Sequence, residues 1–85
     1  MALNISYFAW VREGMARDGE VVEPPPSVQT IADLVRWLAA RDAAGAAIFA
    51  DLSRLPAARN GVMAPLETVI DGATKIDLFP PVTGG

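Results

Sequence analysis

The sequence TIADLVRWL, residues 30–38, contains the clearest structural pattern of the 85-residue chain. Its apolar side chains recur at intervals of three and four residues, at Ile31, Leu34, Val35 and Leu38. This spacing places them on one face of an α-helix. Thr30 stands before the apolar run as an N-cap, and Asp33 completes a variant of the capping box. The pattern predicts an amphipathic helix over residues 31–42 that packs on a core.

Two strands are predicted before this helix. Leu3, Ile5 and Tyr7 alternate with polar residues, which is the two-residue period of a half-buried strand, here over residues 2–9. The polar stretch 12–18 is interpreted as a turn region with room for one helical turn. Residues 20–23 predict a second strand, antiparallel to the first. It ends at the three prolines 24–26, because proline cannot donate a hydrogen bond to a strand ladder.

Two further strands are predicted after the helix. Residues 43–55 are rich in alanine and have no clear period, so no element is assigned there. Residues 57–63 predict a third strand, with Asn60-Gly61 as a bulge or turn within it. Asp71-Gly72 predicts a tight turn, and the alternating residues 75–79 predict the last strand.

The order strand, strand, helix, strand, strand predicts an α+β fold of the β-grasp type. One main helix would pack on a mixed sheet of four or five strands. The β-grasp domain would span residues 1–81, and residues 82–85 would form a flexible tail.

The composition excludes several kinds of site. A net charge of -3 argues against a nucleic-acid surface, which needs a basic face. The sequence has no cysteine and no histidine, which removes thiol nucleophiles, the usual zinc ligands and the commonest general base. No phosphate-binding glycine-rich loop, membrane-spanning stretch or signal sequence is found. We therefore expect a cytoplasmic protein with no metal and no cofactor of its own.

The C-terminal sequence FPPVTGG, residues 79–85, is the candidate reactive segment. Pro80 and Pro81 favour extended backbone, so the tail should project from the domain: Val82, Thr83, Gly84 and Gly85. Four extended residues reach at most about 13–14 Å, enough to enter a partner's active site. Two glycines allow a narrow channel to close around the backbone. The Gly85 carboxylate needs activation, for example as an acyl-adenylate, by a partner that binds ATP.

Strand alternation also predicts a docking surface. If Leu3, Ile5 and Tyr7 face the helix, Phe8 faces the opposite side of the sheet, and the same argument places Phe79 there. Met63 is expected on that side and Val62 on the inward side. Three large apolar side chains beside the tail indicate a partner-docking site formed by Phe8, Met63 and Phe79. The alternative is that one or more of them only covers the edge of the core. Asp71 and Asp77 are interpreted as solvated surface acids.

The two ends of the chain resemble a known family. The sequence LFPPVTGG, residues 78–85, resembles the end of the small, sulfur-carrying subunit of molybdopterin synthase, a ubiquitin-like β-grasp protein. The sequence YFAWVRE, residues 7–13, resembles that family's first strand and following turn. The helix after Thr30 and the residue Asn60 also fall at matching places. The turn DGATKI, residues 71–76, departs from the family, because the two acids usually found there are absent.

The resemblance implies a chemistry for the tail. Gly85 would be adenylated by an enzyme of the ubiquitin-activating type and converted to a thiocarboxylate by a sulfur donor. The tail would then enter the large subunit of molybdopterin synthase and give its sulfur to a cyclic pterin precursor. The strand positions that match Phe8, Met63 and Phe79 form, in the family, the hydrophobic surface used by both partners. The protein would be a non-catalytic subunit of a sulfurtransferase complex.

Three other functions stay open on the sequence alone. The chain could carry sulfur for another pathway, such as thiazole or thiolated-tRNA synthesis. It could be a protein modifier joined to lysines through Gly85, or a β-grasp interaction domain with an inert tail. The sequence FPPVT before the two glycines favours the synthase.

Overall fold

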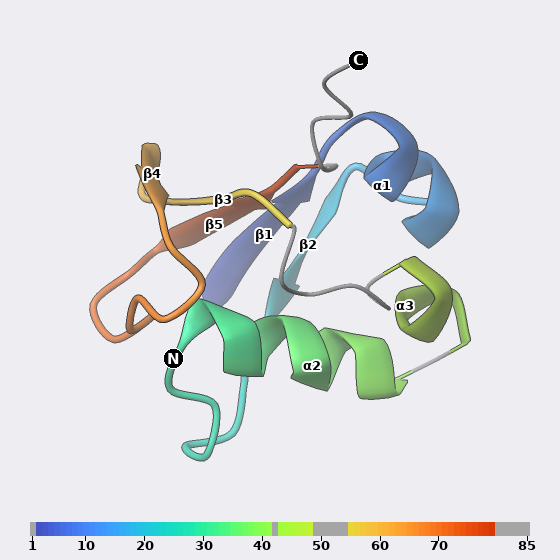
Figure 1. Cartoon of the computed structure of the whole chain (residues 1–85). Coiled ribbons are helices and arrows are strands. Elements are labelled where there is room, and N and C mark those ends of the chain that lie inside the picture. The colour runs from blue at the N-terminus through green and yellow to red at the C-terminus, as the bar shows by residue number, and fades with distance from the viewer. Residues whose placement is uncertain (1, 42, 49–54, 80–85) are drawn as a thin grey trace.

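The computed structural model describes residues 2–41, 43–48 and 55–79 (Figure 1). The elements in these ranges are, in chain order, β1 (Leu3–Tyr7), α1 (Ala9–Met15), β2 (Gly19–Val22), α2 (Ile31–Arg41), α3 (Ala43–Ile48), β3 (Ala57–Arg59), β4 (Val62–Ala64) and β5 (Lys75–Leu78). No helix in the described part of the chain is long and apolar enough to cross a membrane.

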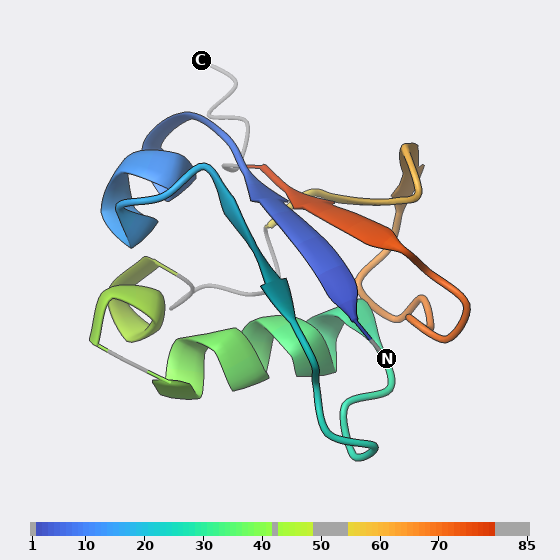
Figure 2. The same cartoon turned by 180° about the vertical axis from the view of Figure 1, so that it is seen from behind.

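The strands form one mixed sheet in the order β2-β1-β5-β3-β4. β1 pairs antiparallel with β2 and parallel with β5, and β3 pairs antiparallel with both β5 and β4. Helix α2 crosses one face of this sheet, as Figure 1 shows from one side and Figure 2 from behind. The predicted β-grasp arrangement of one main helix on a mixed sheet is confirmed. The face of the sheet that points away from α2 is called the outer face below.

The core lies between α2 and the two central strands. The four apolar residues of the predicted helix stripe are completely buried: Ile31, Leu34, Val35 and Leu38. They pack with the inward residues of β1 and β5, which are also buried: Leu3, Ile5, Tyr7, Ile76 and Leu78. The apolar residues of the helix pattern and those of the strand pattern therefore belong to one core, as predicted.

The start of α2 is fixed by the predicted capping box. The Thr30 hydroxyl accepts a hydrogen bond from the Asp33 N–H at 3.1 Å. In return, Asp33 Oδ2 accepts the N–H groups of Gln29 and Thr30 at 3.2 and 3.3 Å. These backbone donors lower the pKa of the Asp33 carboxyl group.

The segment after β1 differs from the prediction. The first strand ends at Tyr7 rather than at residue 9, because a seven-residue helix, α1, begins at Ala9. Val11 and Met15 lie one helical turn apart and are both buried, which explains why this polar stretch folds as a helix. The helix ends at Ala16 in the left-handed conformation, with φ at 60°. A second short helix, α3, occupies part of the alanine-rich stretch where no element was predicted.

Residues 57–63 are not one strand but most of a hairpin. Asn60 and Gly61 form the two-residue turn between β3 and β4, with φ values of 50° and 83°. Asn-Gly favours this left-handed pair of conformations, which matches the twist of the flanking strands. The Asn60 side-chain oxygen also accepts the N–H groups of Thr74 and Lys75 at 2.9 and 3.0 Å. The hairpin is thereby held against the start of β5.

Val62 lies on the predicted side of the sheet but is not buried. It pairs with Arg59, which in turn pairs with the buried Ile76, so its side chain is on the inward side. The side chain is nevertheless 68 % exposed. β4 is the edge strand, and an open groove lies between it and α2. Ala64 of β4 packs against the core, whereas Val62 does not reach it.

The carboxylate of Glu20 connects three elements of the fold through hydrogen bonds. Glu20 of β2 accepts two hydrogen bonds from the Arg41 guanidinium of α2, both at 2.8 Å. It also accepts the Tyr7 hydroxyl of β1 at 2.6 Å and lies 3.2 Å from Arg17. The Arg41 hydrogen bonds are the main cause that lowers the pKa of Glu20 to about 2. Burial, with the Glu20 hydrogen bond as a second cause, raises the pKa of Tyr7.

This arrangement predicts a pH dependence of stability. The pKa of Glu20 is about 2 in the folded protein against 4.5 for an unperturbed glutamate, so the ionised group stabilises the fold above pH 4.5. That contribution is lost as the pH falls toward 2. We expect Glu20→Gln to lower the free energy of unfolding by roughly 2 kcal/mol at pH 7 and to flatten its decline below pH 4.5.

Urea unfolding from pH 2 to pH 7, followed by circular dichroism, measures both effects. Glu23→Gln is the matched control, because Glu23 is exposed and the same charge is removed. Its free energy of unfolding should stay within about 0.5 kcal/mol of the wild type. A Glu20→Gln variant with the wild-type pH profile would contradict the role assigned to Glu20.

Candidate functional site

The candidate site lies where β1 and β5 end. These strands are parallel neighbours, and Tyr7 is paired with Leu78 in their register. Phe8 directly follows β1 and Phe79 directly follows β5, so the two residues leave the sheet side by side. Their rings stack with centroids 4.7 Å apart and an angle of 18° between their planes. Parallel pairing thus joins residues from opposite ends of the sequence into one aromatic pair.

The aromatic pair is held by backbone contacts on both sides. The Phe8 carbonyl accepts the N–H groups of Val11 and Arg12 at the start of α1, at 3.1 and 3.4 Å. The Phe79 N–H donates to the Pro56 carbonyl at 3.0 Å. Phe8 is 38 % exposed, and Phe79 is partly exposed. The pair is a fixed apolar surface, because its backbone is anchored while its rings reach solvent.

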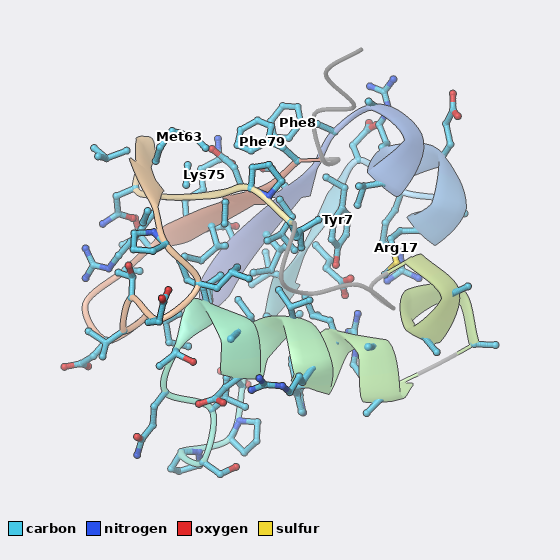
Figure 3. The ribbon with its side chains drawn as sticks, viewed as in Figure 1. Tyr7, Phe8, Arg17, Met63, Lys75 and Phe79 are labelled. Carbon is cyan, nitrogen blue, oxygen red and sulfur yellow. The ribbon has the colours of Figure 1, made fainter. Side chains whose placement is uncertain are left out.

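Met63 lies on the same face of the sheet. It is paired with Ala58, which is in turn paired with Asp77 of β5, so all three side chains share the outer face. Met63 is 62 % exposed. Figure 3 shows Phe8, Phe79, Lys75 and Met63 along the face that points away from α2. The predicted outward placement of Phe8, Met63 and Phe79 is thus observed. These three residues are called the docking surface, after the role that we predict for them.

Asp77 was expected to be a solvated acid, and this expectation is wrong. Its side chain does lie on the outer face, but the residue is only 8 % exposed. Ser6 and Ala58 flank it across the sheet, and Lys75 and Phe79 flank it along the strand. The larger neighbours shield the carboxylate. The alternation of side chains along β5 predicts the face of the sheet on which Asp77 lies. The burial of Asp77 depends on the strand register, which the sequence alone does not give.

The tail itself lies outside the described residues. The structure describes the chain up to Phe79, so the roles of Pro80, Pro81, Val82, Thr83, Gly84 and Gly85 stay predictions. Among the described residues, no group of three or more acidic, cysteine or histidine side chains could hold a metal ion.

A comparison with protein families gives a match over residues 5–85, to the ThiS family. The chain belongs to the ThiS family. The match covers almost the whole sequence, including Phe8, Phe79 and the residues of the tail. The family consists of ubiquitin-like β-grasp sulfur carriers, so the predicted class of protein is confirmed. No functionally curated protein matches the sequence.

Solved structures show the same fold. SAMP1 from Haloferax volcanii superposes with a TM-score of 0.75 at 24 % identity, over 100 % of both chains. The HVO 2177 protein of the same organism gives 0.78 at 23 % identity, over 100 % of this chain and 87 % of the other. A putative molybdopterin converting factor, subunit 1, from Pyrococcus furiosus gives 0.73 at 21 % identity, over 96 % and 99 %. At these identities the likeness shows a shared β-grasp fold.

The exposure of the aromatic pair predicts a small effect on folding. Because Phe8 is partly exposed, we expect Phe8→Ala to lower the free energy of unfolding by about 1 kcal/mol. Leu78→Ala, at a completely buried neighbour, should cost roughly 2–5 kcal/mol. Urea unfolding of both variants measures the contrast. Equal losses would mean that Phe8 is part of the core rather than of a surface.

Proposed function

We propose that this protein is the sulfur-carrying small subunit of molybdopterin synthase. The observation that carries the proposal is the stacked, solvent-accessible pair of Phe8 and Phe79, in which Phe79 directly precedes the sequence PPVTGG. A carrier of this kind needs a surface that binds the partner and a tail that enters it, and here the two are adjacent. Membership of the ThiS family and the fold shared with a putative molybdopterin converting factor subunit support the proposal.

The proposed chemistry takes place at Gly85. Its carboxylate oxygen attacks the α-phosphate of ATP held by a ubiquitin-activating-type adenylating enzyme, which forms the acyl-adenylate and releases pyrophosphate. The terminal sulfur of a donor persulfide then attacks the acyl carbon and displaces AMP, which gives an acyl disulfide. A thiol of the partner attacks the donor's own sulfur in this disulfide, so the S–S bond breaks, the Gly85 thiocarboxylate is released and a disulfide remains on the donor. In the large subunit of the synthase this sulfur passes to a cyclic pterin precursor, and hydrolysis restores the carboxylate. The partners supply ATP, the sulfur and the catalytic groups.

In this proposal the docking surface sets the order of events. Phe8, Met63 and Phe79 contact the adenylating enzyme first and the large subunit afterwards. Because one surface serves both partners, the carrier leaves the first before it binds the second. Buried aromatic residues commonly provide most of the binding energy of an interface, which suits Phe8 and Phe79 to this role.

A second function competes for the same tail. One protein with this fold is named a small archaeal modifier protein, which favours conjugation to lysine side chains as the alternative. Sulfur carriers for thiazole or thiolated-tRNA synthesis would perform the same first steps. Products distinguish them: a thiocarboxylate accepted by the large synthase subunit supports the proposal, and isopeptide-linked proteins support the modifier.

Intact-mass analysis tests the carrier chemistry. We expect incubation with the adenylating enzyme, ATP and a sulfur donor to raise the mass by one oxygen-to-sulfur exchange, located in the C-terminal peptide and lost on alkaline hydrolysis. A variant that lacks Gly84 and Gly85 is the control and should stay unmodified with its fold intact. An unmodified full-length chain under these conditions would count against the proposal.

Binding to the large subunit tests the docking surface. We expect Phe79→Asp to weaken binding by at least about tenfold, because a carboxylate replaces an aromatic anchor. Val69→Asp is the control, since Val69 is also an exposed apolar residue but lies beside Pro24 and Pro25, at a surface that includes neither Phe8 nor Phe79. Calorimetric titration measures both affinities. Unfolding of Phe79→Asp, or binding equal to the wild type, would exclude Phe79 from the docking surface.

A further inference from the structure

We propose that Asp77 is a recognition residue within the docking surface, and that the partner presents an arginine side chain that pairs with it. The inference rests on the proposed function, because it identifies what the large subunit must offer to this surface. It concerns an acidic residue among apolar ones, whose presence the apolar character of the docking surface does not explain.

Asp77 lies among the docking residues. On β5 it is two residues before Phe79, so both side chains project from the outer face. On the other side, the strand register places Ala58 and then Met63 next to it. A partner that covers both Phe79 and Met63 therefore also covers Asp77.

The carboxylate of Asp77 is poorly satisfied within the chain. Its Oδ1 atom is completely buried and has no hydrogen-bond partner in the described part of the chain. Lys75 Nζ lies 3.5 Å from this oxygen, longer than the 2.7–2.9 Å of a charge-assisted hydrogen bond, and the Lys75 side chain is half exposed. An ion pair of this kind contributes little. Burying a carboxylate without hydrogen bonds is unfavourable, so Asp77 opposes folding more than it supports it.

Glu20 shows how the same chain satisfies a shielded carboxylate when the fold requires one. Glu20 accepts a hydrogen bond from Tyr7 and two from Arg41, all between 2.6 and 2.8 Å. Its side chain is 13 % exposed, almost the same as the 12 % of Asp77. Two acids with nearly equally exposed side chains thus differ in their partners. The Asp77 side chain lies on the outer face and is 12 % exposed, so a partner protein that covers this face can reach the part of the carboxylate that still meets solvent.

The surroundings of Asp77 specify the chemistry of that donor. An entirely apolar partner would remove the remaining water from the carboxylate and return no hydrogen bond. A guanidinium replaces the lost hydrogen bonds from water with a planar pair of N–H donors. It also packs well against an aromatic ring. Phe79 offers that ring on the same strand face. We therefore assign an arginine, with apolar residues around it, to the partner surface.

This arrangement gives the docking surface selectivity. Apolar patches bind many apolar patches, but a carboxylate with few hydrogen bonds in the middle of one disfavours every partner that lacks the matching cation. Asp77 would thus admit the cognate partner and reject others, at some cost to the stability of the free carrier.

Paired measurements of binding and folding test the inference. We expect Asp77→Ala to bind the large subunit of molybdopterin synthase from the same cell at least about tenfold more weakly, and its affinity to depend less on salt. Its midpoint of urea unfolding should equal or exceed that of the wild type. Glu23→Gln, which removes the same charge from an exposed position, should change neither measurement. A charge exchange, Asp77→Arg with the partner's arginine changed to aspartate, should restore binding.

The outcomes separate this inference from the proposed function. If Asp77→Ala binds as tightly as the wild type while Phe79→Asp binds weakly, the recognition role of Asp77 is wrong and the docking surface stands. If Asp77→Ala unfolds at clearly lower urea concentration, Asp77 is structural and the inference is wrong. If the wild type does not bind the large subunit, both proposals fail.

Discussion

The rest of the structure depends on the parallel pairing of β1 with β5. These strands are the centre of the mixed sheet, and their inward residues form the layer on which α2 packs. Their parallel direction means that they end together. Residues 8 and 79, far apart in the sequence, therefore become neighbours at the same end of the sheet. A single pairing thus supplies the core on one face and the apolar surface on the other.

The parts of this architecture that depend on local order were predictable. The spacing of Ile31, Leu34 and Leu38 and the capping box at Thr30 depend only on residues within one or two turns of helix. Strand alternation placed Phe8, Met63 and Phe79 on the outer face for the same reason. Only one helical turn was expected in the stretch where α1 forms, because two buried apolar residues, Val11 and Met15, are too few for a period to be recognised.

The features that were left open or predicted wrongly depend on tertiary contacts. Asn60-Gly61 is compatible with a bulge or a turn, and the pairing of Ala58 with Met63 decides between them. Val62 is exposed because α2 does not extend over the edge strand. Asp77 is buried because Ser6 and Ala58 become its neighbours only when three strands are in register. The candidate site could thus be located from the sequence, but the acid within it could not be interpreted.

The pairing of β1 with β5 also has a consequence for synthesis of the protein in the cell. Asn4 of β1 and Lys75 of β5 are paired in this register, so β1 cannot complete its pairing in the sheet until β5 has been synthesised. Contacts between residues this distant form late, because a long loop must close first. The Phe8–Phe79 stack is therefore absent from an incomplete nascent chain. A translation product that stops before β5 lacks the apolar surface by which, under the proposed function, the carrier binds its partners, so it would not compete with finished copies for them.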